Sequence, residues 1–184
     1  MKTVVGDSGI GAVVGDADAR WMRAALARAR EAAEEFDEVP VGAVVVSGTG
    51  ELLAAAGNRT RTDCDPTAHA EVVALREAAR RARVFRLTGA TVYSTIEPCA
   101  MCAGALVQAR VRRLVYGARD ERAGAVESVF RVCDNGSLNH RIELTAGVLE
   151  TECRELMQRF FRARRKTEDR DQRPEVSEDS DTTD

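Results

Sequence analysis

The sequence predicts one α/β domain in which helices cover both faces of a mixed five-stranded sheet, a three-layer α/β/α arrangement. Three observations support this fold class. Amphipathic helical periodicity occurs near both ends of the chain, short β-branched runs lie between the helices, and a strand–helix–strand alternation spans residues 91–118. The length of 184 residues and the hydrophobic content of 44% suit a single globular core.

The first predicted helix covers residues 18–35. Its apolar positions recur at spacings of four, three and four residues (Met22, Leu26, Ala29, Ala33), which places them on one helix face. A β-hairpin is predicted next. Residues 41–47 are rich in β-branched side chains, a glycine-containing turn occupies residues 48–50, and residues 52–57 form the returning strand.

Helices and strands alternate in the second half of the domain. Asp65 and Pro66 form a cap and first-turn pattern, which predicts a helix from there to about Arg83. The remaining elements are a strand over 91–96, a helix over 98–109, strands over 113–118 and 142–146, and a helix over 149–166. The strand–helix–strand unit predicts parallel pairing across a right-handed crossover.

The two ends of the chain differ in composition from this domain at residues 18–166. Residues 1–17 have no sustained period, and residues 167–184 are charged and lack aromatic side chains, so we expect both to be disordered extensions. The C-terminal tail holds eight acidic and two basic residues, a charge of −6, so the rest of the chain carries +3 of the total of −3. A basic domain suits an anionic partner such as RNA, and equally a merely solvated surface.

Several classes of protein are excluded by what the sequence lacks. The longest apolar runs, at residues 41–46 and 52–56, are far shorter than the ~18 residues of a membrane span, so no membrane association is expected. No basic segment followed by an apolar one begins the chain, which favours a cytoplasmic protein. Five cysteines cannot all pair within one chain, so we expect reduced thiols.

Three residues have the types and spacing of a catalytic zinc site. Cys99 and Cys102 are three residues apart at a predicted helix start, so both thiols lie on one face. The positive end of the helix dipole favours their thiolates. His69, at the start of another helix, supplies a third ligand, and catalytic zinc sites use three protein ligands and leave the fourth position to water.

Glu71 has a separate predicted role. It lies two residues after His69, so the two side chains diverge on a helix and do not readily chelate one ion. Zinc lowers the pKa of bound water from about 16 toward ~7, and Glu71 is the group placed to take up the released proton.

The same residues are compatible with other roles. A lone C-x-x-C is also found in structural zinc sites and in redox motifs, although the second C-x-x-C of the former is absent. His140 precedes a predicted strand and is expected to be a structural histidine. Cys64 is expected to stay uncoordinated, because a fourth protein ligand would close the site.

Longer motifs resemble one family. H-A-E followed by P-C-x-x-C resembles the signature of zinc-dependent cytidine and nucleobase deaminases. The flanking segments are similar to those of the bacterial tRNA-specific adenosine deaminases, and together they span residues 20–166. These segments are W-M-R at 21–23, V-P-V-G-A at 39–43, G-N-R at 57–59, D-P-T-A-H-A-E at 65–71, E-P-C-A-M-C-A-G-A at 97–105, L-N-H-R at 138–141 and F-F-R at 160–162.

The resemblance implies a fold, a reaction and a set of partners. The fold would be that of cytidine deaminases, residues 18–166 would form the deaminase domain, and the chain would be a homodimer with one Zn²⁺ per chain. The reaction would be hydrolysis of the wobble adenosine of a tRNA anticodon stem-loop to inosine. His69, Cys99 and Cys102 would hold zinc while Glu71 moves protons.

The resemblance also implies residues that contact the substrate. Asn58 would hydrogen-bond the purine, and the backbone around Val41, Ala70 and Glu97 would shape the pocket. A second group would contact RNA: Asp120, Phe161, Arg162, Arg164 and Arg165. The alternatives are that Asn58 is an ordinary turn residue and Asp120 a solvated loop residue. Phe160 fits the apolar stripe of its helix and is expected to be buried.

Two other functions compete with wobble deamination. The first is a zinc deaminase of a free nucleobase or nucleoside such as cytosine or guanine, which would share the metal site but enclose a small substrate. The second is a non-catalytic, zinc-stabilised RNA-binding module. Glu71 argues against the second, because a zinc site that serves only folding needs no proton-transfer group beside it.

Overall fold

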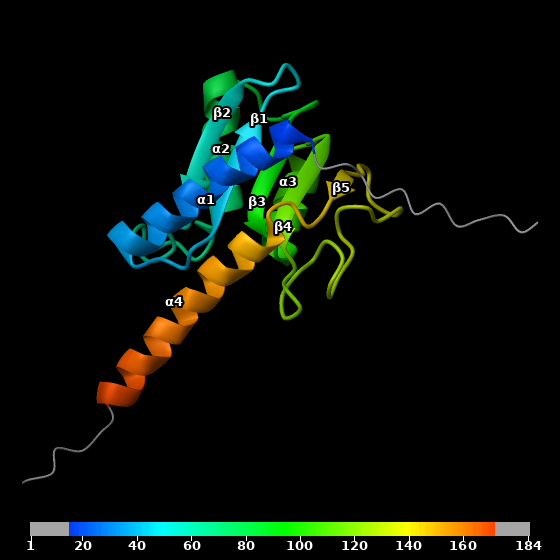
Figure 1. Cartoon of the computed structure of the whole chain (residues 1–184). Coiled ribbons are helices and arrows are strands. Elements are labelled where there is room, and N and C mark those ends of the chain that lie inside the picture. Colours follow the sequence, from blue (N-terminus) through cyan, green and yellow to red (C-terminus); the bar gives the residue numbers. More distant parts are fainter. Residues whose placement is uncertain (1–14, 172–184) are drawn as a thin grey trace, which may run out of the picture.

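A computed structural model describes residues 15–171 of the chain, with side chains described as far as Arg165. A five-stranded sheet forms the middle layer and helices cover both of its faces (Figure 1). The elements follow in the order α1 (Asp16–Phe36), β1 (Gly42–Val46), β2 (Leu52–Gly57), α2 (Ala70–Ala82), β3 (Thr91–Ile96), α3 (Ala100–Gln108), β4 (Arg113–Ala118), β5 (Glu143–Thr145) and α4 (Glu150–Asp171). The three-layer α/β/α fold is confirmed.

The sheet is mixed, with strand order β2-β1-β3-β4-β5. β1 pairs antiparallel with both β2 and β3, so the predicted hairpin is present. β3 and β4 are parallel, as the strand–helix–strand pattern predicts, and β5 is also parallel to β4. Consequently the start of β1 and the ends of β2, β3 and β4 lie at one end of the sheet.

The buried side chains form two clusters, one on each face of the sheet. Val45, Val92 and Leu114 belong to the cluster that includes α2 and α3. Val44 and Val115 belong to the other, which includes α1 and the first part of α4. Neighbouring strand residues point to opposite faces, which is why near-continuous apolar strands fit a sheet covered by helices on both sides.

One predicted helix boundary is wrong. The expected helix start at Asp65 and Pro66 is a turn, and α2 begins at Ala70 with His69 as its N-cap. The Asp65 side chain accepts hydrogen bonds from the backbone N–H and the hydroxyl of Thr67, both at 2.7 Å. This local turn uses the acidic side chain that the sequence pattern assigned to a helix cap.

α4 extends well beyond the sheet (Figure 1). Cys153 in its first turns is 4% exposed and belongs to the core, whereas Phe160 is only half-buried, so the expected burial of Phe160 is wrong. The expectation of disorder for residues 1–17 and 167–184 falls mainly outside the described residues. Within them, residues 16–17 belong to α1 and residues 167–171 to α4. None of the described helices is long and apolar enough to cross a membrane.

Candidate active site

The beginnings of α2 and α3 meet at the end of the sheet where β3 terminates. His69 and Cys99 are the N-cap residues of α2 and α3, and both have extended backbone conformations. The chain therefore turns sharply at each residue before the helix starts. Because both helix N-termini lie at one place, their positive dipole ends and free N–H groups face a common region.

His69, Cys99 and Cys102 form a compact group of metal-ligating atoms. The Nδ1 atom of His69 lies 3.7 Å from the Cys99 sulfur and 3.6 Å from the Cys102 sulfur. All three ligand atoms lie within 4.8 Å of one another. Two sulfurs and one imidazole nitrogen at such separations are able to bind one ion of the size of Zn²⁺.

Cys64 and His140 lie outside this group. Cys64 is exposed and does not belong to the metal-ligating group, in agreement with its expected lack of coordination. The Nε2 atom of His140 lies 2.7 Å from the carbonyl oxygen of Val111. This backbone contact supports the expectation of a structural histidine.

Glu71 lies beside the metal-ligating group without belonging to it. Glu71 is 2% exposed and points toward the sheet. Its Oε1 lies 3.3 Å from the Ser94 hydroxyl, whose one proton is shared between Glu71 and the carbonyl of Ile96 at 2.8 Å. Its Oε2 lies 3.5 Å from the Cys102 sulfur. The separation between ligand and carboxylate that the sequence predicts is therefore present in the structure.

The charges of the group favour a thiolate at Cys99 and a proton-exchanging carboxyl at Glu71. Hydrogen bonds from Cys102 and His69 lower the pKa of Cys99 to about 3. The hydrogen bond with Cys99 raises the pKa of His69, and the contact with Cys99 together with burial raises the pKa of Cys102. Burial raises the pKa of Glu71. A carboxyl group with a raised pKa is suited to accept and return a proton.

Three predicted pocket residues come together near this group. The backbone N–H of Asn58, just after β2, donates to the carbonyl of Val41 at 3.0 Å. The next residue, Arg59, donates to the carbonyl of Ala68 at 2.9 Å, which ties this loop to the segment that leads into His69. Ala70 is fully buried at the start of α2.

Glu97 holds the opposite loop through its side chain. Its Oε1 accepts hydrogen bonds from the backbone N–H groups of Val126, Glu127 and Ser128 at 3.1, 2.7 and 2.9 Å. Its Oε2 accepts from the backbone N–H of Asp120 at 3.1 Å and from the Ser128 hydroxyl. The sequence predicts only a backbone contribution from Glu97. In the structure its side chain fixes the loop at residues 120–128, and Glu97 itself directly precedes Pro98 and Cys99 in the chain.

The ionisation of Glu97 makes the stability of the fold pH-dependent. Burial raises the pKa of Glu97, but the hydrogen bonds from Glu127 and Ser128 outweigh burial and hold the pKa below the ordinary value of 4.5. A lowered folded-state pKa stabilises the fold above 4.5, and this contribution is lost as the pH falls through the folded pKa. We expect the melting temperature of Glu97→Gln to fall less on acidification than that of the wild type. Thermal unfolding at pH values on both sides of 4.5 measures this difference, and parallel curves would contradict it.

The residues predicted to contact RNA are spread over two places. Asp120 is half-buried beside Glu97 and its side chain accepts from the backbone N–H groups of Arg122 and Ala123, so it also shapes its own loop. Phe161, Arg162, Arg164 and Arg165 lie on the part of α4 that extends past the sheet.

The α4 side chains differ in their exposure to solvent and in their contacts within the chain. Phe161 is 41% exposed and packs edge-to-face on Phe160. Arg164 pairs with Asp37 at 2.8 Å, so part of its charge is already neutralised within the chain. Arg162 and Arg165 are exposed, and they are the more accessible cations of the set.

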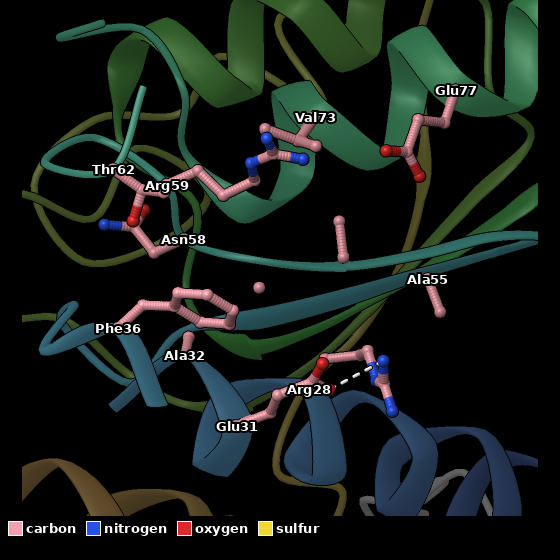
Figure 2. Close-up of a pocket in the computed structure, with 12 residues that line it drawn as sticks. Arg28, Glu31, Ala32, Phe36, Ala55, Asn58, Arg59, Thr62, Val73 and Glu77 are labelled. Atoms are coloured by element: carbon pink, nitrogen blue, oxygen red, sulfur yellow. Dashed lines mark ion pairs between the residues drawn. The ribbon is translucent and has the colours of Figure 1, made fainter. Parts of the chain in front are cut away.

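A cavity of about 300 Å³ lies next to Asn58, between α1 and α2 and over the edge strand β2 (Figure 2). Its lining includes Phe36, Arg59, Val73 and Glu77, but none of the metal-ligating residues. Asn58, Arg59 and Thr62 of the loop after β2 therefore line this cavity, whereas the metal-ligating side chains do not.

Two site residues are not predicted by the sequence. Glu38 is fully buried and binds the loop at residues 58–62, and Ser94 is fully buried and donates to Glu71. Glu38 is one of several acidic residues around the end of α1, and nothing in its spacing sets it apart. Ser94 is one of several hydroxyl-bearing residues in β3, so the sequence does not set it apart.

Comparison with known proteins relates this site to deaminases. A protein-family model described as MafB19-like deaminase matches residues 16–165. The tRNA-specific adenosine deaminase of Haemophilus influenzae is 44% identical over 148 residues, which cover 80% of this chain and 85% of that protein. The tRNA-specific adenosine deaminase of Agrobacterium fabrum is 46% identical over 145 residues, or 79% and 94% of the two chains.

Solved structures give the same relation. A structure from a study of A-to-I editing by tRNA:A34 deaminases at the wobble position has a TM-score of 0.71 and 46% identity, covering 74% of this chain and 98% of that one. Guanine deaminase from Nitrosomonas europaea has a TM-score of 0.64 and 27% identity, covering 77% and 83%. The similarity in sequence is thus greater to the tRNA-acting enzyme.

Proposed function

The chain belongs to the tRNA-specific adenosine deaminase family, and from this membership we propose that it hydrolyses the wobble adenosine of a tRNA anticodon to inosine. The observation that carries the proposal is the placement of Glu71 beside, and outside, a group of three metal-ligating side chains. A site that bound metal only for folding would have no use for a buried carboxylate at that position.

The donor set fits a catalytic zinc ion. His69, Cys99 and Cys102 supply one nitrogen and two sulfur atoms, the number of protein ligands that catalytic zinc sites use. We assign one Zn²⁺ per chain to these residues. When bound, the ion lowers the pKa of a coordinated water and so makes a nucleophile available at neutral pH.

Glu71 moves the protons of the reaction. Hydrolysis forms a bond between C6 of adenine and a water oxygen and breaks the bond between C6 and the amino nitrogen, which leaves as ammonia. Glu71 takes one proton from the attacking water and delivers it to the ring nitrogen. It then takes the second proton of the same oxygen and delivers it to the leaving amino group, so that the oxygen becomes the carbonyl of inosine. Ser94 holds the Glu71 carboxylate in place from the strand below. Asn58, Val41, Ala70 and Glu97 form the surrounding pocket.

RNA is held outside the pocket by charge and stacking. Phe161, Arg162 and Arg165 on α4 are exposed and can contact bases and phosphates of the anticodon loop, and Arg164 would exchange its pairing with Asp37 for a phosphate. Asp120 lies on the loop that Glu97 fixes. Residues 18–166 form the deaminase domain, and residues 167–184 form an acidic tail. Because the substrate is tRNA, we place the enzyme in the cytoplasm.

Incubation with two kinds of substrate tests the proposed function. The purified protein is given an anticodon stem-loop with adenosine at the wobble position and, separately, free guanine, cytosine and adenosine. We expect inosine in the stem-loop and no ammonia from the free compounds. Ammonia from free guanine alone would instead support the activity of the guanine deaminase to which the chain is more distantly similar.

An uncharged surface on α3 supports a homodimer. α3 contains no charged residue, and Met101 on it is 36% exposed. Exposed Phe85 and Leu138, at 81% and 42%, line hollows on the two sides of α3. The hollow at Phe85 is bordered by Arg76, Arg86 and Arg110, so the uncharged part of the surface is α3 itself. Contiguous exposed apolar side chains mark protein interfaces. We propose that this α3 surface binds a second copy of the chain.

A charge placed in this surface tests the dimer. We expect Ala105→Glu to convert the dimer to a monomer, because the substitution would bury an unpaired carboxylate of each copy in the proposed interface. Sedimentation velocity measures the mass of each species. Glu51→Arg, in the exposed β1–β2 turn, serves as the control and is expected to remain dimeric. A dimeric Ala105→Glu variant would place the interface elsewhere.

A further inference from the structure

Glu38 is a fully buried carboxylate that has no step in the proposed reaction. It follows Asp37, the left-handed residue that ends α1. Its Oε1 accepts from the backbone N–H groups of Arg61 and Thr62 at 2.7 and 2.8 Å, and from the Thr62 hydroxyl at 3.0 Å. Its Oε2 accepts from the Asn58 amide at 3.2 Å and the Thr60 hydroxyl at 3.1 Å. All of these partners belong to the loop at residues 58–62.

These hydrogen bonds determine which way the Asn58 amide faces. A carboxylate only accepts, so the amide nitrogen of Asn58 must be the atom that points to Glu38. The second N–H of this nitrogen donates to the Thr60 hydroxyl oxygen at 3.2 Å. The Thr60 hydroxyl donates its only proton to Glu38, so it can only accept from Asn58. Both donors of the amide are occupied.

The amide oxygen of Asn58, a residue that is 6% exposed, is left as an acceptor without a partner in the described part of the chain. Among the described residues, every completely buried side-chain nitrogen or oxygen atom has a hydrogen-bond partner. The oxygen is therefore not fully buried. Figure 2 shows Asn58 and Thr62 together at one end of the cavity. The backbone N–H of Asn58 also donates to the carbonyl of Val41, the residue just before β1.

We propose that Glu38 is a positioning residue that fixes the Asn58 amide so that its oxygen accepts a hydrogen bond from the bound nucleoside. The proposal rests on the proposed function, which makes Asn58 a substrate-binding residue. An adenosine within an RNA chain has two kinds of donor, the ribose 2′-hydroxyl and the 6-amino group. Glu38 thereby selects a donor group on the substrate without touching it.

Glu38→Gln changes the amide orientation with little change in shape. The remaining oxygen keeps the place of Oε1, because two backbone N–H groups point there. The new NH₂ group then faces the Asn58 nitrogen, and two donors repel. The Asn58 amide turns over and presents a donor to the substrate. We expect kcat/KM on the stem-loop to fall by about 10- to 100-fold, the effect of one unmatched hydrogen bond.

A double substitution restores the original polarity. In Glu38→Gln/Asn58→Asp, the new amide at position 38 donates to a carboxylate at position 58, whose other oxygen again accepts from the substrate. We expect this variant to recover most of the lost kcat/KM, whereas Asn58→Asp alone sets two carboxylates against each other and remains impaired. A residue that only stabilised the fold would give no such recovery of activity. Glu35→Gln, an exposed neighbour on α1, is the control.

The experiment measures kcat, KM and melting temperature for the wild type and these variants. A stem-loop with 2′-deoxyadenosine at the wobble position is a second substrate: if the 2′-hydroxyl is the donor, Glu38→Gln lowers kcat/KM on the ribose substrate only. Wild-type kcat/KM in Glu38→Gln, or a folded double variant no better than Glu38→Gln, overturns the proposal. If Glu38→Gln does not fold, a folded and active double variant supports the proposal and an unfolded one overturns it. Absence of inosine with the wild type refutes the proposed function instead. In that case amide hydrogen exchange of residues 58–62 tests the role of Glu38 without a substrate. We then expect slow exchange in the wild type and the double variant, and fast exchange in Glu38→Gln.

Discussion

Replacing Glu71 by glutamine is expected to lower the rate of inosine formation by roughly 10²- to 10⁴-fold and to leave the zinc content unchanged. Glutamine has the shape of glutamate and keeps an oxygen for the hydrogen bond from Ser94. It cannot take up the proton of the attacking water or return it to the leaving amino group. Because Glu71 is outside the group of metal-ligating atoms, the affinity for zinc does not depend on it.

Single-turnover rates and zinc content, measured on the same preparation, test this separation of roles. Glu77→Gln is a matched control on the same helix, since Glu77 lines the neighbouring cavity and contacts neither Glu71 nor the metal ligands. We expect its rate and zinc content to be those of the wild type. Loss of zinc from Glu71→Gln would show that the carboxylate is a ligand, and an unchanged rate would show that another group moves the proton.

The fold follows from local patterns to a large extent. The helical stripe of α1, the turn between β1 and β2 and the β3–α3–β4 unit are each encoded in short stretches of sequence. The beginning of α2 is not, because Asp65 caps a turn through Thr67 and the helix starts only after His69. An acidic residue followed by proline is compatible both with a helix N-cap and with a turn closed by the acidic side chain. The tertiary position of the loop decides which of the two forms.

The site is predictable where chemistry depends on residue type and spacing. His69, Cys99 and Cys102 are recognisable because few other arrangements place one imidazole and two thiols at helix starts. Glu38 and the side-chain role of Glu97 are not recognisable. Their partners are 20 to 31 residues away, and most are backbone N–H groups, which any sequence supplies. Buried carboxylates that organise loops therefore become visible only in three dimensions.

Removing one of the three ligands is expected to remove zinc and activity together. Cys99→Ala leaves one sulfur and one nitrogen in the group, and two protein ligands do not hold a structural or catalytic zinc ion well. Zinc that binds only the folded chain also stabilises it by mass action. We therefore expect added zinc to raise the melting temperature of the wild type after chelation, and to leave that of Cys99→Ala unchanged.

Cys64→Ala distinguishes this effect from a general effect of losing a thiol. Cys64 is exposed, lies only five residues before His69 and is outside the metal-ligating group. We expect this variant to contain one zinc ion per chain and to form inosine at the wild-type rate, as measured by elemental analysis and product formation. Zinc loss from Cys64→Ala would mean that a third thiol occupies the fourth coordination position. The ion would then be enclosed by four protein ligands, with no position left for the water that hydrolysis requires.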